Sequence, residues 1–308
     1  MKQLFLILKT FSHLNLEFMI SDLKRNGIKV VLILVAGERL LTENGDDIKE
    51  EDSIFSGYDY VLTDCNAGIL FACERNIGFV YYEAPQNKEC LTKENKGLGF
   101  GYIKNAQCII QGFEEIDFGF LEKMYERFKH LPWTILTTER LMIREMTVDD
   151  VDRLYEIYAA PEITEYTEPL YEDRNEEIAY TRSYIKNQYE FFGYGMWLVV
   201  EKSTGRIIGR VGLSDREGFS DSEIGYVIEK EKQNKGYATE ACKAVIKYAK
   251  EKLFKKGLNC FIYRDNKVSE RLCRNLGFEF MEYVRFGTDK MMRFYIDLAG
   301  NAEGDDIL

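Results

Sequence analysis

The sequence predicts two domains: a small doubly wound parallel α/β domain over residues 1–131 and a mixed-sheet α+β domain over residues 137–297. The chain has 308 residues, which exceeds the roughly 100 to 200 residues typical of one domain. In the first part, short β-branched or aromatic runs alternate with helical stretches, as in a parallel sheet with crossover helices. Pro132 then interrupts the chain, because proline cannot continue the preceding helix.

The first domain is expected to contain five strands separated by helices. Their apolar runs are bounded by polar and glycine-containing segments, which is typical of strands in a doubly wound fold. The expected strands are Gln3–Leu8, Lys29–Val35, Tyr58–Thr63, Gly78–Tyr82 and Ala106–Gln111. The expected helices are Leu14–Arg25, Ala67–Arg75 and Ile116–Phe128.

This pattern resembles the haloacid-dehalogenase-like and other Rossmann-like folds. Hydrolases of that type carry Asp-x-Asp at the end of the first strand, and Leu8-Lys9-Thr10 offers no acid there. Asp64 follows a later strand, but its neighbours supply no second acid. The glycine-rich run 97–101 has no clear strand before it, so a dinucleotide site is not supported. We expect a degenerate ligand-sensing, dimerisation or substrate-presenting module, with a hydrolase as the alternative.

The second domain begins with a different succession of elements. Thr147–Asp150 looks like a capping box that starts a helix. A second helix is expected over Asn175–Phe192, with Ile178, Ile185, Tyr189 and Phe192 on its buried side. The expected strands are Arg140–Glu145, then Met196–Glu201 and Ile207–Leu213 as a hairpin turned by Ser203–Gly205. Residues 298–308 are rich in Gly, Asp and Asn and are expected to be a flexible tail.

Composition narrows the classes of function. The net charge is −11 and the pI about 5.0, which argues against a nucleic-acid binder and mildly favours a cationic acceptor. No apolar stretch reaches the roughly 18 residues of a membrane span, and the N-terminal apolar run is short for a signal peptide. The seven cysteines form no C-x-x-C pair, and neither histidine has a second ligand at metal spacing, so free thiols, no metal and a cytoplasmic location are expected.

The segment after residue 223 carries the chemistry. Ile224–Ile228 is expected to be a strand, and its internal Gly225 suggests a bulge or a close backbone approach. Gly236 and Ala238 then bracket the start of an amphipathic helix that Gly257 is expected to end. A glycine-containing turn at a helix N-terminus presents unpaired amides to an anion such as a pyrophosphate. An ordinary strand-to-helix loop is the alternative.

Two motifs in this order resemble the GNAT superfamily of acyl-coenzyme A N-acyltransferases, and the opening strand with the run Gly193-Tyr-Gly-Met-Trp-Leu-Val-Val most resembles the branch that acetylates ribosomal-protein N-termini. The two motifs are Gln233-x-x-Gly-x-Ala and Asn266-x-x-Ser, the latter followed by Leu276-Gly-Phe. The resemblance implies acetyl-CoA as co-substrate, its pyrophosphate on the first motif and its pantetheine arm near Asn266. The implied cofactor-binding residues are Val227, Ile228, Gln233, Asn234, Lys235, Gly236, Tyr237, Ala238, Thr239, Asn266 and Ser269.

Two side chains are candidates for the proton transfers of acyl transfer. Glu223 opens the cofactor strand and is the candidate general base, with a solvated acidic run as the alternative. Relatives often place a tyrosine four residues after the serine of the second motif, where this chain has Cys273. A thiol with a pKa near 8.5 is able to protonate a thiolate, although a small buried helix residue is the simpler interpretation.

The acceptor is expected to be a primary amine on a small molecule or a peptide. A homodimer is a possible assembly of the chain. Trp197, Tyr194 and Phe192 are candidates for the acceptor side, with a core position as the alternative. A second hypothesis is a coenzyme A-responsive sensor that keeps the fold and has lost the chemistry.

Overall fold

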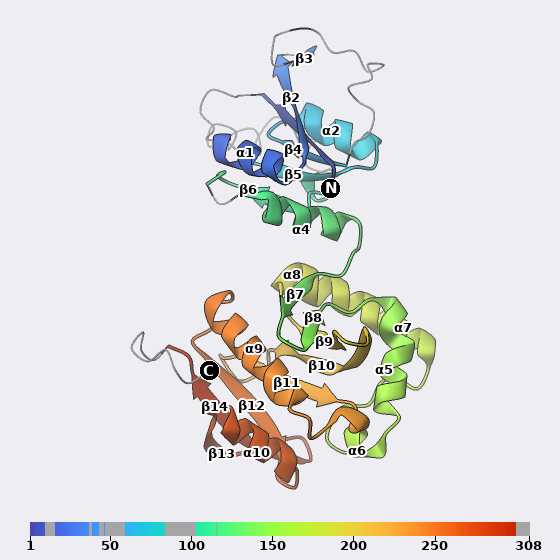
Figure 1. Cartoon of the computed structure of the whole chain (residues 1–308), viewed down its shortest axis with the longest axis vertical. Helices are drawn as coiled ribbons and strands as arrows, with labels where there is room; N and C mark the ends of the chain where they lie inside the picture. Colours follow the sequence, from blue (N-terminus) through green and yellow to red (C-terminus); the bar gives the residue numbers. More distant parts are fainter. Residues whose placement is uncertain are drawn as a thin grey trace. The chain divides into compact units, whose positions relative to one another are not determined.

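The computed structural model describes residues 1–9, 16–36, 39–42, 46, 59–83, 103–114 and 116–299 (Figure 1). The chain folds into two compact units, Met1–Leu131 and Pro132–Leu308, which are described separately below. The glycine-rich run 97–101 and residues 300–308 of the expected tail lie outside the described residues. Among the described residues, no helix has the length and apolar character needed to cross a membrane.

The first unit contains one sheet whose strands follow the order β3-β2-β1-β4-β5-β6. Five of them run parallel, and β3 joins the edge in antiparallel orientation through a short connection from β2. The parallel α/β pattern predicted from the sequence is confirmed, while the edge strand β3 was not predicted. The strands are β1 (Gln3–Leu8), β2 (Lys29–Ala36), β3 (Arg39–Thr42), β4 (Tyr60–Thr63), β5 (Gly78–Tyr82) and β6 (Cys108–Ile110).

Helices cover both faces of this sheet. Successive side chains of a strand point to opposite faces, so Leu6 packs in the cluster that contains α1 and α4, and Ile7 packs in the cluster that contains α2. The central strand β1 is buried along its whole length, as expected for a strand covered on both sides. The helices are α1 (Glu17–Arg25), α2 (Asn66–Glu74) and α4 (Phe118–Phe128).

The second unit is built on a sheet with the order β13-β14-β12-β11-β10-β9-β8-β7. All neighbours are antiparallel except β11 and β12, which run parallel. The predicted hairpin is confirmed as β9 and β10, whereas β7, β13 and β14 were not predicted. The strands are β7 (Thr134–Thr137), β8 (Leu141–Arg144), β9 (Met196–Glu201), β10 (Arg206–Ser214), β11 (Glu223–Ile228), β12 (Gly257–Tyr263), β13 (Glu279–Phe286) and β14 (Asp289–Asp297).

Helices lie on both faces of the second sheet (Figure 1). The fully buried Trp197 on β9 packs edge-on against Tyr248 of α9, with ring centroids 5.6 Å apart. Its neighbour Leu198 therefore faces the opposite side, where α5 and α7 lie. The core interpretation of Trp197 is confirmed. The helices are α5 (Val151–Tyr158), α6 (Pro161–Thr164), α7 (Arg174–Tyr184), α8 (Glu190–Phe192), α9 (Tyr237–Glu251) and α10 (Lys267–Asn275).

One expected helix end and one expected buried position were wrong. Helix α9 ends at Glu251, because the chain turns at Phe254 with a φ of 53°, and Gly257 begins β12. The predicted helix over 175–192 is interrupted by a π segment at Ile185–Tyr189, whose hydrogen bonds reach one residue further than those of an α-helix. This rotates the following side chains, so that Phe192 is 50% exposed.

Candidate functional site

Strands β11 and β12 diverge from a single point. Their register contains one pair, Glu223 opposite Asn259, at the start of β11. The buried Asn259 side chain of β12 is bonded to β14 and to the segment before β11: its Nδ2 donates to the carbonyl oxygen of Asp221 (2.7 Å), and its Oδ1 accepts from Arg293 Nε (2.8 Å). The carboxyl ends of the two parallel strands therefore part, and the backbone of β11 is open on that side.

The gap opens into a cavity of about 500 Å³ that extends from β11 to the N-terminus of α9 and to α10. The residues of both sequence motifs meet here, although about thirty positions separate them in the chain. Of the predicted cofactor residues, Lys235 does not line the cavity. Those that do are Val227, Ile228, Gln233, Asn234, Gly236, Tyr237, Ala238, Thr239, Asn266 and Ser269.

The loop between β11 and α9 lines one end of the cavity. Gly236 has a φ of 80° and Asn234 a φ of 59°, a left-handed conformation that glycine adopts without steric cost. The first helical hydrogen bond of α9 is donated by Glu240 N to Gly236 O (3.0 Å). The amides of residues 237–239 precede it and have no helical acceptor, so the positive end of the helix dipole faces the cavity.

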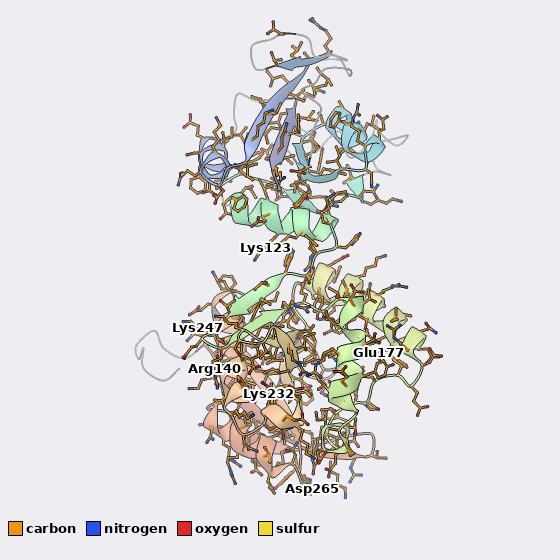
Figure 2. All side chains as sticks on the ribbon, turned by 45° about the vertical axis from the view of Figure 1, so that its right-hand side comes forward. Lys123, Arg140, Glu177, Lys232, Lys247 and Asp265 are labelled. Carbon is orange, nitrogen blue, oxygen red and sulfur yellow. The ribbon has the colours of Figure 1, made fainter. Side chains whose placement is uncertain are left out.

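Arg140, at the start of β8, braces this loop from outside. Its Nη1 donates to the carbonyl oxygen of Lys235 (2.9 Å), and its Nε pairs with Glu240 of α9 at 2.6 Å. The guanidinium also lies 4.3 Å from the ring centroid of Tyr237. Lys232 contacts the same ring, and Figure 2 shows Arg140 and Lys232 next to each other. Arg140 was not predicted from the sequence, because no local pattern links it to a loop 95 residues away.

Glu201, at the end of β9, braces the loop a second time. Its carboxylate accepts hydrogen bonds from Lys232 Nζ (2.7 Å), Tyr237 Oη (2.5 Å) and Thr204 Oγ1 (2.8 Å). These three donors lower the pKa of Glu201 to about 2, since they stabilise the ionised form. A nearly buried carboxylate therefore ties both ends of the loop to the sheet.

Helix α10 forms the other wall of the cavity. Asn266 caps the helix, because its Oδ1 accepts from Ser269 N (3.0 Å). The hydroxyl of Tyr226, which lines the cavity from β11, donates to the carbonyl oxygen of Ser269 (3.4 Å). Burial raises the pKa of Tyr226, so this hydroxyl stays protonated. Tyr226 was not singled out from the sequence, where it is one aromatic position within a strand. Lys267 and Arg271 add positive charge to the same wall.

The two predicted catalytic side chains lie outside the cavity lining. The carboxylate of Glu223 is 14% exposed and forms a two-pronged ion pair with Arg216, whose Nη2 lies 3.1 Å from Oε1. Cys273 is 1% exposed and contacts Cys260 inside the core, where a hydrogen bond with Cys273 together with burial raises the pKa of the Cys260 thiol. Both positions are close to the cofactor strand without facing the cavity directly.

In the first unit, Asp64 lies at the carboxyl end of β4 beside the end of β1. It is 2% exposed, and its Oδ1 accepts from the Lys9 amide (2.7 Å). Its carboxylate therefore helps to join two strand ends. Across the described ranges of both units, no group of three or more His, Cys, Asp or Glu side chains is arranged to hold a metal ion.

Known proteins match the part of this chain that forms the cavity. Residues 140–279 match the family described as "Acetyltransferase (GNAT) domain". The chain is 30% identical to "Uncharacterized protein YkkB" of Bacillus subtilis over 49% of this chain and 89% of that protein. It is 27% identical to "Uncharacterized N-acetyltransferase YoaA" of the same organism over 47% and 82%.

Among solved structures, the chain is similar to the ribosomal-protein-S5-alanine acetyltransferase of Vibrio fischeri, with 15% identity and a TM-score of 0.47. That alignment covers 56% of this chain and 98% of the other. The family match covers β8 to α10, which include the elements that form the cavity and both motifs. The chain therefore belongs to the GNAT acetyltransferase family, through the domain that its second unit forms.

Proposed function

We propose that the second unit transfers an acetyl group from acetyl-CoA directly to a primary amine, on a small molecule or a peptide N-terminus. The observation that supports this most strongly is the open N-terminus of α9 at one end of the cavity that separates β11 from β12. Such a helix end stabilises a pyrophosphate, and the gap beside it accommodates an extended arm. Acetyl-CoA would supply the thioester, and the protein's own groups position it.

The phosphates are assigned to the loop amides and to two cations. The amides of residues 237–239 have no helical acceptor and belong to residues that line the cavity, and a side chain on Gly236 would be strained at a φ of 80°. Arg271 lines the cavity and is exposed, and among the described residues it makes no ion pair. Its guanidinium is therefore available for a phosphate. The exposed ammonium group of Lys267 on the same wall pairs with Glu270 at 3.0 Å, and a phosphate would take the place of that partner.

The amide of Ile228 is the candidate donor to the thioester oxygen. Glu229 N donates to Ile208 O on β10 (2.8 Å), so the amides of β11 point alternately toward β10 and toward the gap. By this alternation Val227 N–H points to β10 and Ile228 N–H points into the gap. An unpaired amide there stabilises the charge that develops on the thioester oxygen.

Acyl transfer forms a C–N bond, breaks the C–S bond, and requires one proton to leave the amine and one to reach the thiolate. We assign the first transfer to Glu223, which lies on the same strand face as Val227 and about 13 Å from it at roughly 3.3 Å per residue. The path therefore includes water. Cys273 and Tyr226 are the candidates for the second transfer, and Tyr226 is the one that lines the cavity.

The direct test is acceptor-dependent release of free thiol from acetyl-CoA with a panel of amines. Calorimetric titration with coenzyme A on the same protein measures binding independently of turnover. Thiol release that rises with amine concentration supports the proposal. Coenzyme binding without any acceptor-dependent thiol release would contradict this proposal and favour a sensor that only binds the coenzyme.

A further inference from the structure

Arg210 lies beside the strand position assigned to the thioester. It sits on β10 directly opposite Val227 of β11, with Leu198 of β9 on its other side. Because Glu229 and Ile208 form a hydrogen-bonded pair, Arg210 and Val227 two residues along form the next such pair, with Cα atoms about 5.5 Å apart. Directly opposed side chains share a face, so the Arg210 side chain points to the face that carries α5 and α7.

Glu223, Gly225 and Val227 alternate onto that same face of β11. The side chains of the candidate base Glu223 and of Arg210 thus lie on the same face of the sheet. Gly225 lies between Glu223 and Val227, the residue opposite Arg210. The side chain of Trp197, by contrast, points to α9 on the other side. An amine that gives its proton to Glu223 must approach on the Arg210 side.

Arg210 is the exception among the partly buried arginines of this unit. Its Nε is buried and has no hydrogen-bond partner, and within the described residues no carboxylate forms an ion pair with it. The comparable pairs are Arg144 with Asp150, Arg153 with Glu229, Arg216 with Glu223, and Arg293 with Glu282. Leaving a desolvated charge without a counter-charge costs free energy, so a site that keeps one is suited to an external anion.

The hydroxyls of Tyr158, Tyr184 and Tyr189 lie near this guanidinium, and it forms a hydrogen bond with Tyr158. Burial lowers the pKa of Arg210 and the hydroxyls near it raise it, with a net upward shift, so the group stays charged. Tyr184 Oη accepts from Met196 N (2.7 Å), which leaves its own proton for a further acceptor. Burial also raises the pKa of Tyr180, and the charge of Arg210 opposes that shift. The residue as a whole is half-buried, and β9 and β11 lie on either side of its backbone.

We propose that Arg210 binds an oxyanion on the acceptor, so that the substrate is a small amine that also carries a carboxylate or a phosphate. The amine would then lie beside Val227 and the anionic group against the guanidinium. This deepens the function proposed above and depends on it. The negative net charge of the protein repels an anionic acceptor at long range, and salt screens this repulsion. The attraction by Arg210 acts at contact distance.

Two carboxylates act on Tyr180, which the charge of Arg210 also affects. They are Glu177 and Glu168, and Glu177 Oε2 already accepts from the amide of Tyr171 (3.0 Å). Glu177 is labelled in Figure 2 on α7. Neither carboxylate forms an ion pair with Arg210 among the described residues, so the guanidinium is not neutralised internally.

Matched acceptor pairs test this proposal. Each L-amino acid is compared with its amide, and O-phosphoethanolamine with ethanolamine, by acceptor-dependent thiol release from the full chain. We expect at least a tenfold higher kcat/KM for the anionic member, because a site built for a polar group discriminates strongly against an analogue that lacks it. The pair with the larger ratio identifies carboxylate or phosphate. Equal kcat/KM for both members of every pair would overturn the assignment while leaving acetyl transfer intact.

Variants link this preference to Arg210. In Arg210→Gln, the ratio of kcat/KM for the anionic acceptor to that for the neutral acceptor should fall close to one. Arg210→Lys should keep part of this ratio because the charge remains. Arg206→Gln removes the same charge from an exposed position on the same strand and should leave the ratio unchanged. An unchanged ratio in Arg210→Gln would show that Arg210 does not recognise the anionic group of the acceptor.

A binding measurement separates this inference from the proposed reaction. Inorganic phosphate and acetate are added at constant ionic strength, and the melting temperature of the full chain is compared with that of Arg210→Gln. An increase seen only with Arg210 present supports the anion site even if no amine is acetylated, in which case the proposed reaction alone fails. Equal increases in both proteins, or none in either, would show that Arg210 holds no anion. Because the substitution itself changes the melting temperature, each shift is taken relative to the same protein in chloride.

Discussion

The guanidinium of Arg140 donates a hydrogen bond of 2.9 Å to the carbonyl oxygen of Lys235, inside the loop that presents its amides to the cavity. Arg140→Gln should loosen that loop and raise the KM for acetyl-CoA roughly tenfold, given that a hydrogen bond from a charged group contributes about 1.5 kcal/mol. The kcat should change less, because Arg140 does not face the acetyl group. Steady-state kinetics and coenzyme titration measure both effects. An unchanged KM, with Arg206→Gln as the control, would contradict the bracing role.

The stability of the protein should depend on the ionisation of Glu201. Its folded pKa is lowered to about 2, so the stabilisation is fully present above the unfolded value of about 4.3 and is lost as the pH falls toward 2. Glu201→Gln should therefore lower the melting temperature at pH 7 and flatten its decline in acid. Melting curves between pH 7 and pH 2 test this, with exposed Glu217→Gln as the matched control. Parallel curves for wild type and Glu201→Gln would refute it.

Glu223→Gln should lower kcat at least tenfold while the KM for acetyl-CoA stays the same, since general base catalysis typically contributes about 100-fold or more. Arg216→Gln is the necessary companion, because it also removes the ion pair but keeps the carboxylate. It should retain most of the turnover. If both variants lose kcat to the same extent, the ion pair matters for structure and Glu223 is not the base.

Tyr226→Phe and Cys273→Ala together identify the group that protonates the thiolate. Tyr226 lines the cavity and Cys273 is buried in the core, so we expect Tyr226→Phe to lower kcat. Cys273→Ala should mainly reduce stability, by about 1 kcal/mol for the small cavity it creates. Rate measurements across pH, paired with melting temperatures, distinguish the two effects. A loss of kcat in Cys273→Ala at unchanged stability would assign the transfer to the thiol.

Strands with a strong apolar pattern were predictable from the sequence, and weakly patterned ones were not. Every residue of β1 and β5 is buried, and both strands were predicted with the observed boundaries. In β13, six of the eight side chains are exposed and two are half-buried, so the alternation that marks a strand is missing. The exposed Phe192 was misplaced because a π segment cannot be inferred from apolar spacing alone.

The same limit applies to the site. Local motifs predicted the loop and the helix cap, because a glycine turn and an asparagine before a helix act on neighbouring residues. Arg140, Glu201 and Arg210 act on parts of the chain that only the sheet brings near them. Their charge is visible in the sequence, but the presence or absence of a partner is a property of the folded sheet.

Asn259 gives the cavity a mechanical property. The register of β11 and β12 has its single pair at Asn259, whose backbone amide and side chain both bond to the segment before β11 and whose side chain also bonds to β14. The two strands therefore diverge like two arms from a pivot at this residue. With arms of about 15 Å, one degree of rotation at the pivot moves the open ends by roughly 0.3 Å, taking about 3.3 Å per residue. A substitution at Asn259 would therefore act far from the place where it is made, by changing the width of the slot at its mouth.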